Sequence, residues 1–192
     1  MADKVTASRL VLAPVFFVIY LSHRFFPSVF AASLWTVPVL WGIFVLSELT
    51  DLLDGMIARK RGEVSDFGKF FDPFADTLTQ LTYFFCFAID GLLPPVLFLA
   101  VLYREFSILF IRNLMLKKGI AMGARMGGKI KTVTYVLAGG IALLASSVQR
   151  LGMGAELYNT LAAAAAVVFG ISVLIAIVSF FDYVSVYRKT NG

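Results

Sequence analysis

The stretch SELTDLLDGMIARKRGEVSDFGKFFDPFADTL, residues 47–78, gathers acidic side chains inside a chain that is otherwise strongly apolar. Of the 192 residues, 59% are hydrophobic and only 15% are charged. A water-soluble domain with a polar exterior does not carry so apolar a composition. The sequence therefore predicts an integral membrane protein, in which clustered carboxylates need an explanation of their own.

Six apolar runs extend along the chain on either side of this stretch. They cover residues 10–21, 34–46, 81–89, 92–103, 136–145 and 162–181. With their neighbours, several of them exceed the roughly 20 residues that a helix needs to cross the hydrocarbon core. We therefore expect an all-α integral membrane protein of six transmembrane helices, forming a single domain over residues 1–192.

The distribution of lysine and arginine predicts which side of the membrane holds each connection. The first, third and fifth connections hold only Arg24 and Arg150. Apart from Arg104 and Arg112, the other cations fall near the termini or in the second and fourth connections: Lys4, Arg9, Arg59, Lys60, Arg61, Lys69, Lys117, Lys118, Arg125, Lys129, Lys131, Arg188 and Lys189. Because cytoplasmic segments are enriched in positive charge, both termini and the acidic stretch should be cytoplasmic, in a multi-pass protein of the cell membrane. The net charge of +5 reflects this topology and attraction to anionic lipid, and we expect no nucleic-acid partner.

The acidic stretch itself predicts a tight helical hairpin. The second helix should run from about Trp35 to about Lys60, with Gly62 as its stop, and the third should begin near Ser65 or Asp66, either of which can cap it. At 100° per residue, one face of the second helix carries Asp51, Asp54, Gly55, Ala58 and Arg59. One face of the third carries Ser65, Gly68, Asp72 and Asp76. The hairpin brings these two faces together.

Carboxylates at membrane depth are costly, by about 2.5 to 3.5 kcal/mol each. Arg59 alone cannot neutralise four aspartates, whereas divalent cations can. An all-oxygen ligand set points to Mg²⁺ or Mn²⁺, and makes zinc a poor fit. The alternative is a solvated cytoplasmic cap in which the acids pair with Lys60, Arg61 and Lys69. Two facing rows of acids with small residues between them favour the metal site.

The two rows resemble the signature of the CDP-alcohol phosphotransferases. The matching residues are D51-L-L-D54-G55-M-I-A58-R59, then eight residues, then G68-K-F-F-D72-P-F-A-D76. The resemblance implies that Asp51, Asp54, Asp72 and Asp76 bind two divalent ions, with Asp76 also acting as general base. It implies that Gly55, Ala58, Arg59, Ser65 and Gly68 bind the CDP-linked donor. Members of this family displace CMP from that donor with the hydroxyl of an acceptor alcohol, and they are commonly dimeric.

Downstream, YREFSILFIRNLM and GGKIKT are similar to stretches of the phosphatidylglycerophosphate synthases within this family, so the resemblance covers about residues 6–135. It implies CDP-diacylglycerol as donor and glycerol 3-phosphate as acceptor. Arg104, Arg112, Lys129 and Lys131 could then bind the acceptor phosphate. Other possibilities are that Arg104 pairs with Glu105 and that the two lysines reflect positive-inside topology alone.

Some assignments stay open. Serine, inositol phosphate or a second lipid could replace glycerol 3-phosphate as acceptor, and Thr77 stands where these synthases carry a lysine. Beyond about Tyr135 the sequence shows only apolar spans, suited to packing between subunits. A cation channel or transporter is a competing class, but its path would need acids near the midplane of other spans.

Overall fold

The computed structural model describes residues 2–26, 34–61, 66–120 and 126–191. Within these ranges the side chains at 2–5, 51–61, 66–67, 69–70 and 190–191 fall outside the description. All of the described secondary structure is helical. The helices are α1 (Ala2–Phe25), α3 (Thr36–Arg61), α4 (Asp66–Ile89), α5 (Pro95–Lys117), α6 (Met126–Arg150) and α7 (Ala155–Asn191). The predicted all-α class is confirmed.

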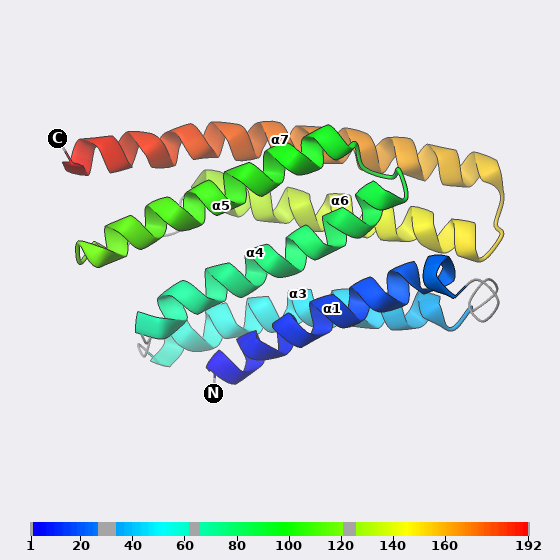
Figure 1. Ribbon diagram of the computed structural model, residues 1–192, viewed down its shortest axis with the longest axis horizontal. Coiled ribbons are helices and arrows are strands. Elements are labelled where there is room, and N and C mark those ends of the chain that lie inside the picture. Colours follow the sequence, from blue (N-terminus) through cyan, green and yellow to red (C-terminus); the bar gives the residue numbers. More distant parts are fainter. Residues whose placement is uncertain (1, 27–33, 62–65, 121–125, 192) are drawn as a thin grey trace.

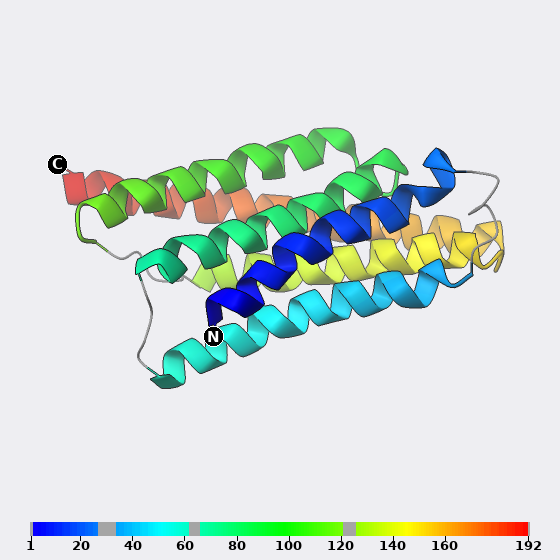
Figure 2. The same ribbon diagram turned by 60° about the horizontal axis from the view of Figure 1, so that its bottom comes forward.

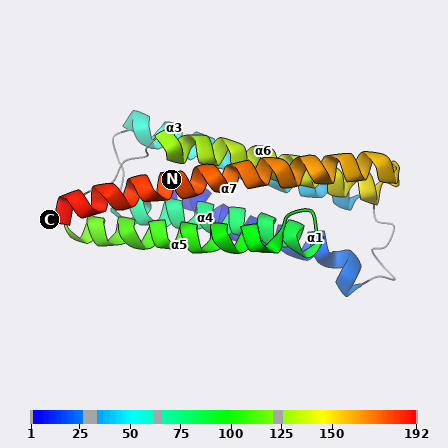
Figure 3. The same ribbon diagram turned by 90° about the horizontal axis from the view of Figure 1, so that it is seen from above.

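The six helices run up and down in one elongated bundle (Figure 1). α4 packs against α1, α5 and α6. The last helix, α7, lies along α5 and α6 and packs against both (Figures 2 and 3). Both chain ends lie at the same end of the bundle as the C-terminal ends of α3 and α5. We call this the terminus end, and the opposite end the turn end. The cation-rich segments of the sequence therefore meet at the terminus end.

The predicted hairpin is confirmed in its helix boundaries. The second helix was expected over about residues 35–60 and runs over Thr36–Arg61, and the third begins at Asp66. The end of α3 and the start of α4 both lie at the terminus end, but they stand apart there (Figure 2). Gly62 and Ser65 lie outside the described residues.

Among the described residues, three helical stretches are long and apolar enough to cross a membrane. They are Thr6–Phe25, Met126–Arg150 and Ala155–Lys189. In α3 only Thr36–Thr50 is strongly apolar, because the charged stretch begins directly after it. In α5 the buried side chains of Arg104 and Glu105 interrupt the apolar run. Buried charge is not confined to α5, because Arg9 of α1 and Lys131 of α6 are also buried.

Aromatic rings fill the middle of the bundle. Phe16 on α1 lies with its ring centroid 4.5 Å from that of Tyr83 on α4. Phe84, one residue on, meets Phe169 of α7 at 4.9 Å and Tyr135 of α6 at 5.1 Å. Aromatic pairs at such separations add about 0.5 to 1.5 kcal/mol to the burial of their surface. α4 is therefore the helix through which both halves of the bundle share a core.

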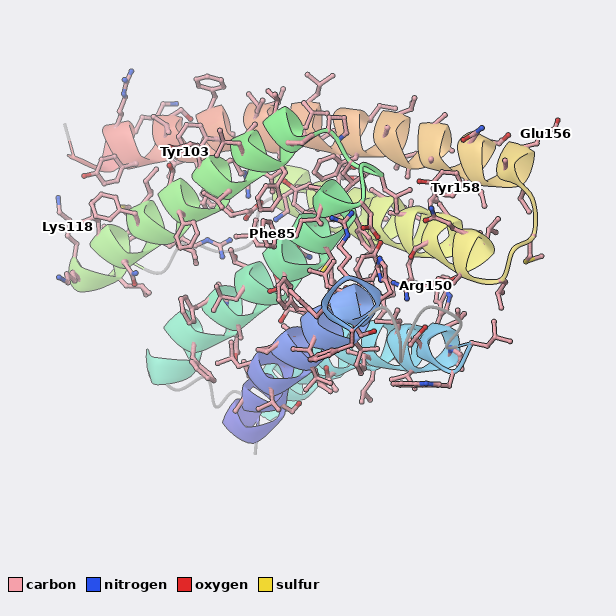
Figure 4. The ribbon with its side chains drawn as sticks, turned by 45° about the vertical axis from the view of Figure 1, so that its right-hand side comes forward. Phe85, Tyr103, Lys118, Arg150, Glu156 and Tyr158 are labelled. Atoms are coloured by element: carbon pink, nitrogen blue, oxygen red, sulfur yellow. The ribbon has the colours of Figure 1, made fainter. Side chains whose placement is uncertain are left out.

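Arg150 holds three helices together at the turn end (Figure 4). From the last residue of α6 its guanidinium donates to the Tyr20 carbonyl of α1 at 2.7 Å and to the Thr36 hydroxyl of α3 at 3.4 Å. It also donates to Ser146 one turn back, at 3.2 Å, and stacks 5.0 Å from the centroid of the Tyr20 ring. Arg150, which the sequence placed in an external connection, thus links α6 to α1 and α3, and we call this set of contacts the clasp.

Replacing Arg150 should loosen the turn end. Arg150→Met should lower the free energy of unfolding by about 2 kcal/mol, because hydrogen bonds from a charged donor contribute about 1.5 to 3 kcal/mol each. Thermal unfolding of the purified protein in detergent, followed by circular dichroism, measures the loss. The control is Arg24→Gln, since Arg24 pairs with Asp90 at 2.9 Å but is half exposed, and should cost less than about 1 kcal/mol. Equal losses in the two variants would contradict the clasp.

Candidate functional site

A cavity of about 150 Å³ opens between α4, α5, α6 and α7. Its wall combines charged, hydroxyl-bearing and apolar side chains from all four helices. The lining residues are Pro73, Asp76, Thr77, Arg104, Glu105, Ile108, Leu109, Arg112, Gly128, Lys129, Lys131, Thr132 and Tyr183. Four of them are cations and two are carboxylates, so the wall carries an excess of positive charge suited to an anion.

The structure brings together all four cations that the sequence singled out. Arg104 and Lys131 are buried, with 7% and 6% of their surface exposed, and Arg112 is half-buried. Lys129 is exposed at the rim. Cations from α5 and from α6, the helices on either side of the fourth connection, therefore line one cavity. The hypothesis of a shared phosphate site requires this arrangement.

Glu105 fixes two of these cations. Arg104 donates through Nη1 to both carboxylate oxygens of Glu105, at 2.9 and 3.0 Å, and Lys131 Nζ donates to Oε1 at 3.0 Å. Glu105 itself is only 6% exposed. Pairing with Glu105, weighed from the sequence as the alternative for Arg104, is what the structure shows, and Arg104 lines the cavity as well. The ion pairs orient both cations before any ligand arrives.

Arg104 also reaches α7. Its Nε donates to the Ala176 carbonyl at 3.1 Å and its Nη2 to the Ser179 hydroxyl at 3.3 Å. At the same level, Gly127 of α6 lies close to α7, because a Cβ at that position would lie 3.2 Å from Cβ of Ser179. The start of α6 therefore packs on α7 beside the cavity without an intervening side chain.

Arg112 makes a second connection to α7, through Tyr183. Its Nη2 donates to the Tyr183 hydroxyl at 2.9 Å, and the centre of its guanidinium lies 5.3 Å from the centroid of the Tyr183 ring. Arg112 Nε is buried without a hydrogen-bond partner. Because a buried donor without an acceptor costs about 1 to 3 kcal/mol, an anionic ligand beside Arg112 would be stabilised.

The acids of α4 lie along the same side of the bundle. Asp76 lines the cavity, followed directly by Thr77, which is 6% exposed. One turn earlier, Asp72 accepts a hydrogen bond of 2.7 Å from the hydroxyl of Thr6, a fully buried residue of α1. A carboxylate held by a buried hydroxyl keeps a defined orientation. Gly68 is buried further toward the start of α4.

The remaining predicted site residues lie beyond what can be placed in detail. Asp51, Asp54, Gly55, Ala58 and Arg59 belong to the last turns of α3, but their side chains lie outside the described residues, as does Ser65 altogether. Among the side chains that are described, no three of His, Cys, Asp and Glu gather into a group that could hold a metal. The predicted four-aspartate site stays a prediction, of which the structure describes only the α4 half.

Sequence reasoning missed three contributors: Thr6, Ser179 and Tyr183. The region beyond Tyr135 was expected to serve only packing, and that expectation is wrong for α7, which supplies Ser179 and Tyr183. A signal was present, because a tyrosine two residues after the last apolar run is a polar group at the end of a span. Nothing in a single sequence says which cavity it faces.

The fold and the cavity define a class: an all-helical, apolar protein with a cationic pocket beside helix-borne carboxylates. Residues 1–178 match the family model described as CDP-alcohol phosphatidyltransferase, and the chain belongs to this family of transferases. A Treponema pallidum (strain Nichols) protein named CDP-diacylglycerol–glycerol-3-phosphate 3-phosphatidyltransferase is 37% identical over 191 residues, covering 97% of this chain and 88% of its own length. A Bacillus subtilis (strain 168) protein of the same name is 32% identical over 146 residues, covering 74% of this chain and 75% of its own.

The Glu105 ion pairs predict non-additive stability. Glu105→Gln should lower the free energy of unfolding by about 3 kcal/mol, because removing one partner leaves buried cations uncompensated. Lys131→Met should also destabilise the protein. The double variant should lose less than the sum of the two single variants, because it lacks both partners of the Lys131–Glu105 pair and leaves only Arg104 uncompensated. Denaturation of the four proteins in one detergent gives the cycle, and additive losses would show that the pair is not coupled.

Proposed function

We propose that this chain transfers the phosphatidyl group of CDP-diacylglycerol to glycerol 3-phosphate, giving phosphatidylglycerophosphate and CMP. The observation that carries the proposal is the cavity itself, where cations from α5 and α6 lie beside the carboxylate of Asp76. An acceptor that bears both a phosphate and a reacting hydroxyl needs these two kinds of group side by side. The names of the relatives agree with this acceptor.

On the acceptor side, the proposal gives each cavity residue one task. Arg112, Lys129 and Lys131 bind the phosphate of glycerol 3-phosphate, and Arg104 lies behind them, tied to Glu105 and α7. A guanidinium can bind two phosphate oxygens at once, whereas an ammonium acts as a point charge. Binding the phosphate in a fixed place positions the acceptor hydroxyl toward Asp76.

The chemical step follows from that position. Asp76 takes the proton of the acceptor hydroxyl, whose oxygen forms a bond to the phosphorus that carries diacylglycerol. The bond from this phosphorus to the oxygen of the CMP phosphate breaks, and CMP leaves. Thr6 maintains the orientation of Asp72 through the hydrogen bond of 2.7 Å. Asp72 and Asp76 thus act from successive turns of α4.

The donor side rests on residues of the hairpin. Asp51, Asp54, Asp72 and Asp76 would hold two Mg²⁺ or Mn²⁺ ions, and their carboxylate oxygens are the ligands that such ions prefer. When bound, the ions neutralise the diphosphate and stabilise the departing CMP. Gly55, Ala58, Arg59, Ser65 and Gly68 would surround the cytidine nucleotide.

The membrane arrangement belongs to the same proposal. All six helices would span the cell membrane, with the terminus end cytoplasmic, and two copies would form a homodimer in the lipid. The up-and-down bundle supports it, because the cation-rich segments then share one side. The acceptor, which is water-soluble, would reach the cavity from the cytoplasm.

An acceptor panel tests the reaction. Purified protein with CDP-diacylglycerol should release CMP on addition of glycerol 3-phosphate, and only with Mg²⁺ or Mn²⁺ present. Serine should support less than about a tenth of that rate, because it lacks the phosphate and a missing charge-assisted contact costs about a factor of ten or more. Inositol phosphate and phosphatidylglycerol carry a phosphate but are larger than glycerol 3-phosphate, and should also react more slowly in a cavity of about 150 Å³. Release that is independent of glycerol 3-phosphate, or faster with another acceptor, would overturn this assignment.

Asp72→Asn should abolish turnover, by about a thousandfold or more, while leaving the fold intact. The amide keeps the shape of the side chain but lacks the charge that a metal ligand needs. CMP release measures turnover, and circular dichroism with thermal unfolding measures the fold. The matched control is Asp90→Asn, just beyond the other end of α4, where the carboxylate pairs with Arg24, and it should keep full turnover. An active Asp72→Asn enzyme would exclude this role for Asp72.

A further inference from the structure

Tyr183 on α7 has an arrangement that packing alone does not explain. It is 1% exposed, and it is the single contribution of α7 to the described wall of the cavity. Its hydroxyl oxygen accepts the hydrogen bond from Arg112 Nη2 at 2.9 Å, and its ring lies beneath the same guanidinium. The tyrosine therefore holds Arg112 by two contacts of different kinds.

The Tyr183 hydroxyl also carries a hydrogen, which the bond from Arg112 does not use. A phenolic group can donate one hydrogen bond while it accepts another. The four cations of the wall cannot accept, and the carboxylate of Glu105 is already bound by Arg104 and Lys131 through three hydrogen bonds. The hydroxyl of Thr132, across the wall on α6, donates to the Gly128 carbonyl at 3.1 Å. An oxygen of a bound anion is a suitable acceptor for the Tyr183 hydrogen.

Space beside the hydroxyl is left open by Gly128. A Cβ at position 128 would lie 3.7 Å from the Tyr183 hydroxyl oxygen, in ordinary contact. Any larger side chain would extend across the hydroxyl, whereas glycine leaves it facing the cavity that both residues line. The local sequence of α6 is thus compatible with a ligand reaching Tyr183.

We propose that Tyr183 is a phosphate-binding residue of the acceptor site. Its hydroxyl donates to a phosphate oxygen of glycerol 3-phosphate while it fixes Arg112 against the same group. This inference rests on the proposed function for the identity of the acceptor. It adds a neutral donor from the last helix to the cations of α5 and α6, and it makes α7 part of the selection for phosphorylated acceptors.

The test is Tyr183→Phe, which removes the hydroxyl and retains the ring beneath Arg112. Purified wild type and variant are compared for binding of glycerol 3-phosphate, by calorimetry without donor, and for steady-state turnover. We expect the Kd and the KM for glycerol 3-phosphate to rise about tenfold, as for loss of a hydrogen bond to a charged group. The KM for CDP-diacylglycerol and the kcat should change less than about twofold, a pattern that a general loss of packing would not produce.

The matched control is Tyr83→Phe. Tyr83 is equally buried, at 2%, but belongs to the aromatic core of α4 and does not line the cavity. It should leave the binding of glycerol 3-phosphate unchanged, and thermal unfolding of both variants reports any effect on the fold. Unchanged binding in Tyr183→Phe, or an equal loss in both variants, overturns the role of Tyr183, as does a wild type that binds no glycerol 3-phosphate. A wild type that binds it but transfers nothing to it would overturn the proposed function, while the binding comparison still decides the role of Tyr183.

Discussion

Everything at the cavity depends on the burial of one carboxylate, Glu105, between two cations. In a bundle with an apolar exterior, a charge pointing inward must find its counter-charge within the protein. Glu105 meets Arg104 from its own helix and Lys131 from α6, and Arg104 continues to α7. Glu105 therefore joins α5 to α6 directly, and to α7 through Arg104.

This constraint also separates two tasks among cations of one cavity. Arg104 and Lys131 are oriented by Glu105, which also neutralises part of their charge. Among the described residues, no carboxylate pairs with Arg112 or Lys129; Arg112 contacts Tyr183, and Lys129 is exposed. A ligand phosphate would draw mainly on these two, with Lys131 between the two groups. Orientation before binding lowers the cost of ordering side chains around the ligand.

The sequence predicted the helices and their charged residues, but it did not predict which residues those charged groups contact. The hairpin boundaries followed from Gly62, Asp66 and the periodicity, because helix caps are local in the chain. The convergence of Arg112 and Lys131 was implied by the family resemblance. The contact between Thr6 and Asp72 did not, since it joins residues 66 positions apart through the tilt of α1 against α4. Tyr183 was missed for the same reason. Of the six expected spans, three are long and apolar enough to cross a membrane within the part of the chain that the structure describes.

The length and charge pattern of α7 indicate how deep in a membrane the cavity would lie. Its 37 residues extend for about 55 Å, well beyond a hydrocarbon layer of about 30 Å. Between Glu156 and Asp182 the helix carries no charge, so this portion is the part that matches the lipid tails. Tyr183 follows directly after Asp182. On the proposed membrane arrangement, the cavity would lie at the level of the lipid headgroups, where a substrate dissolved in water and one anchored by its acyl chains could meet without either leaving its own solvent.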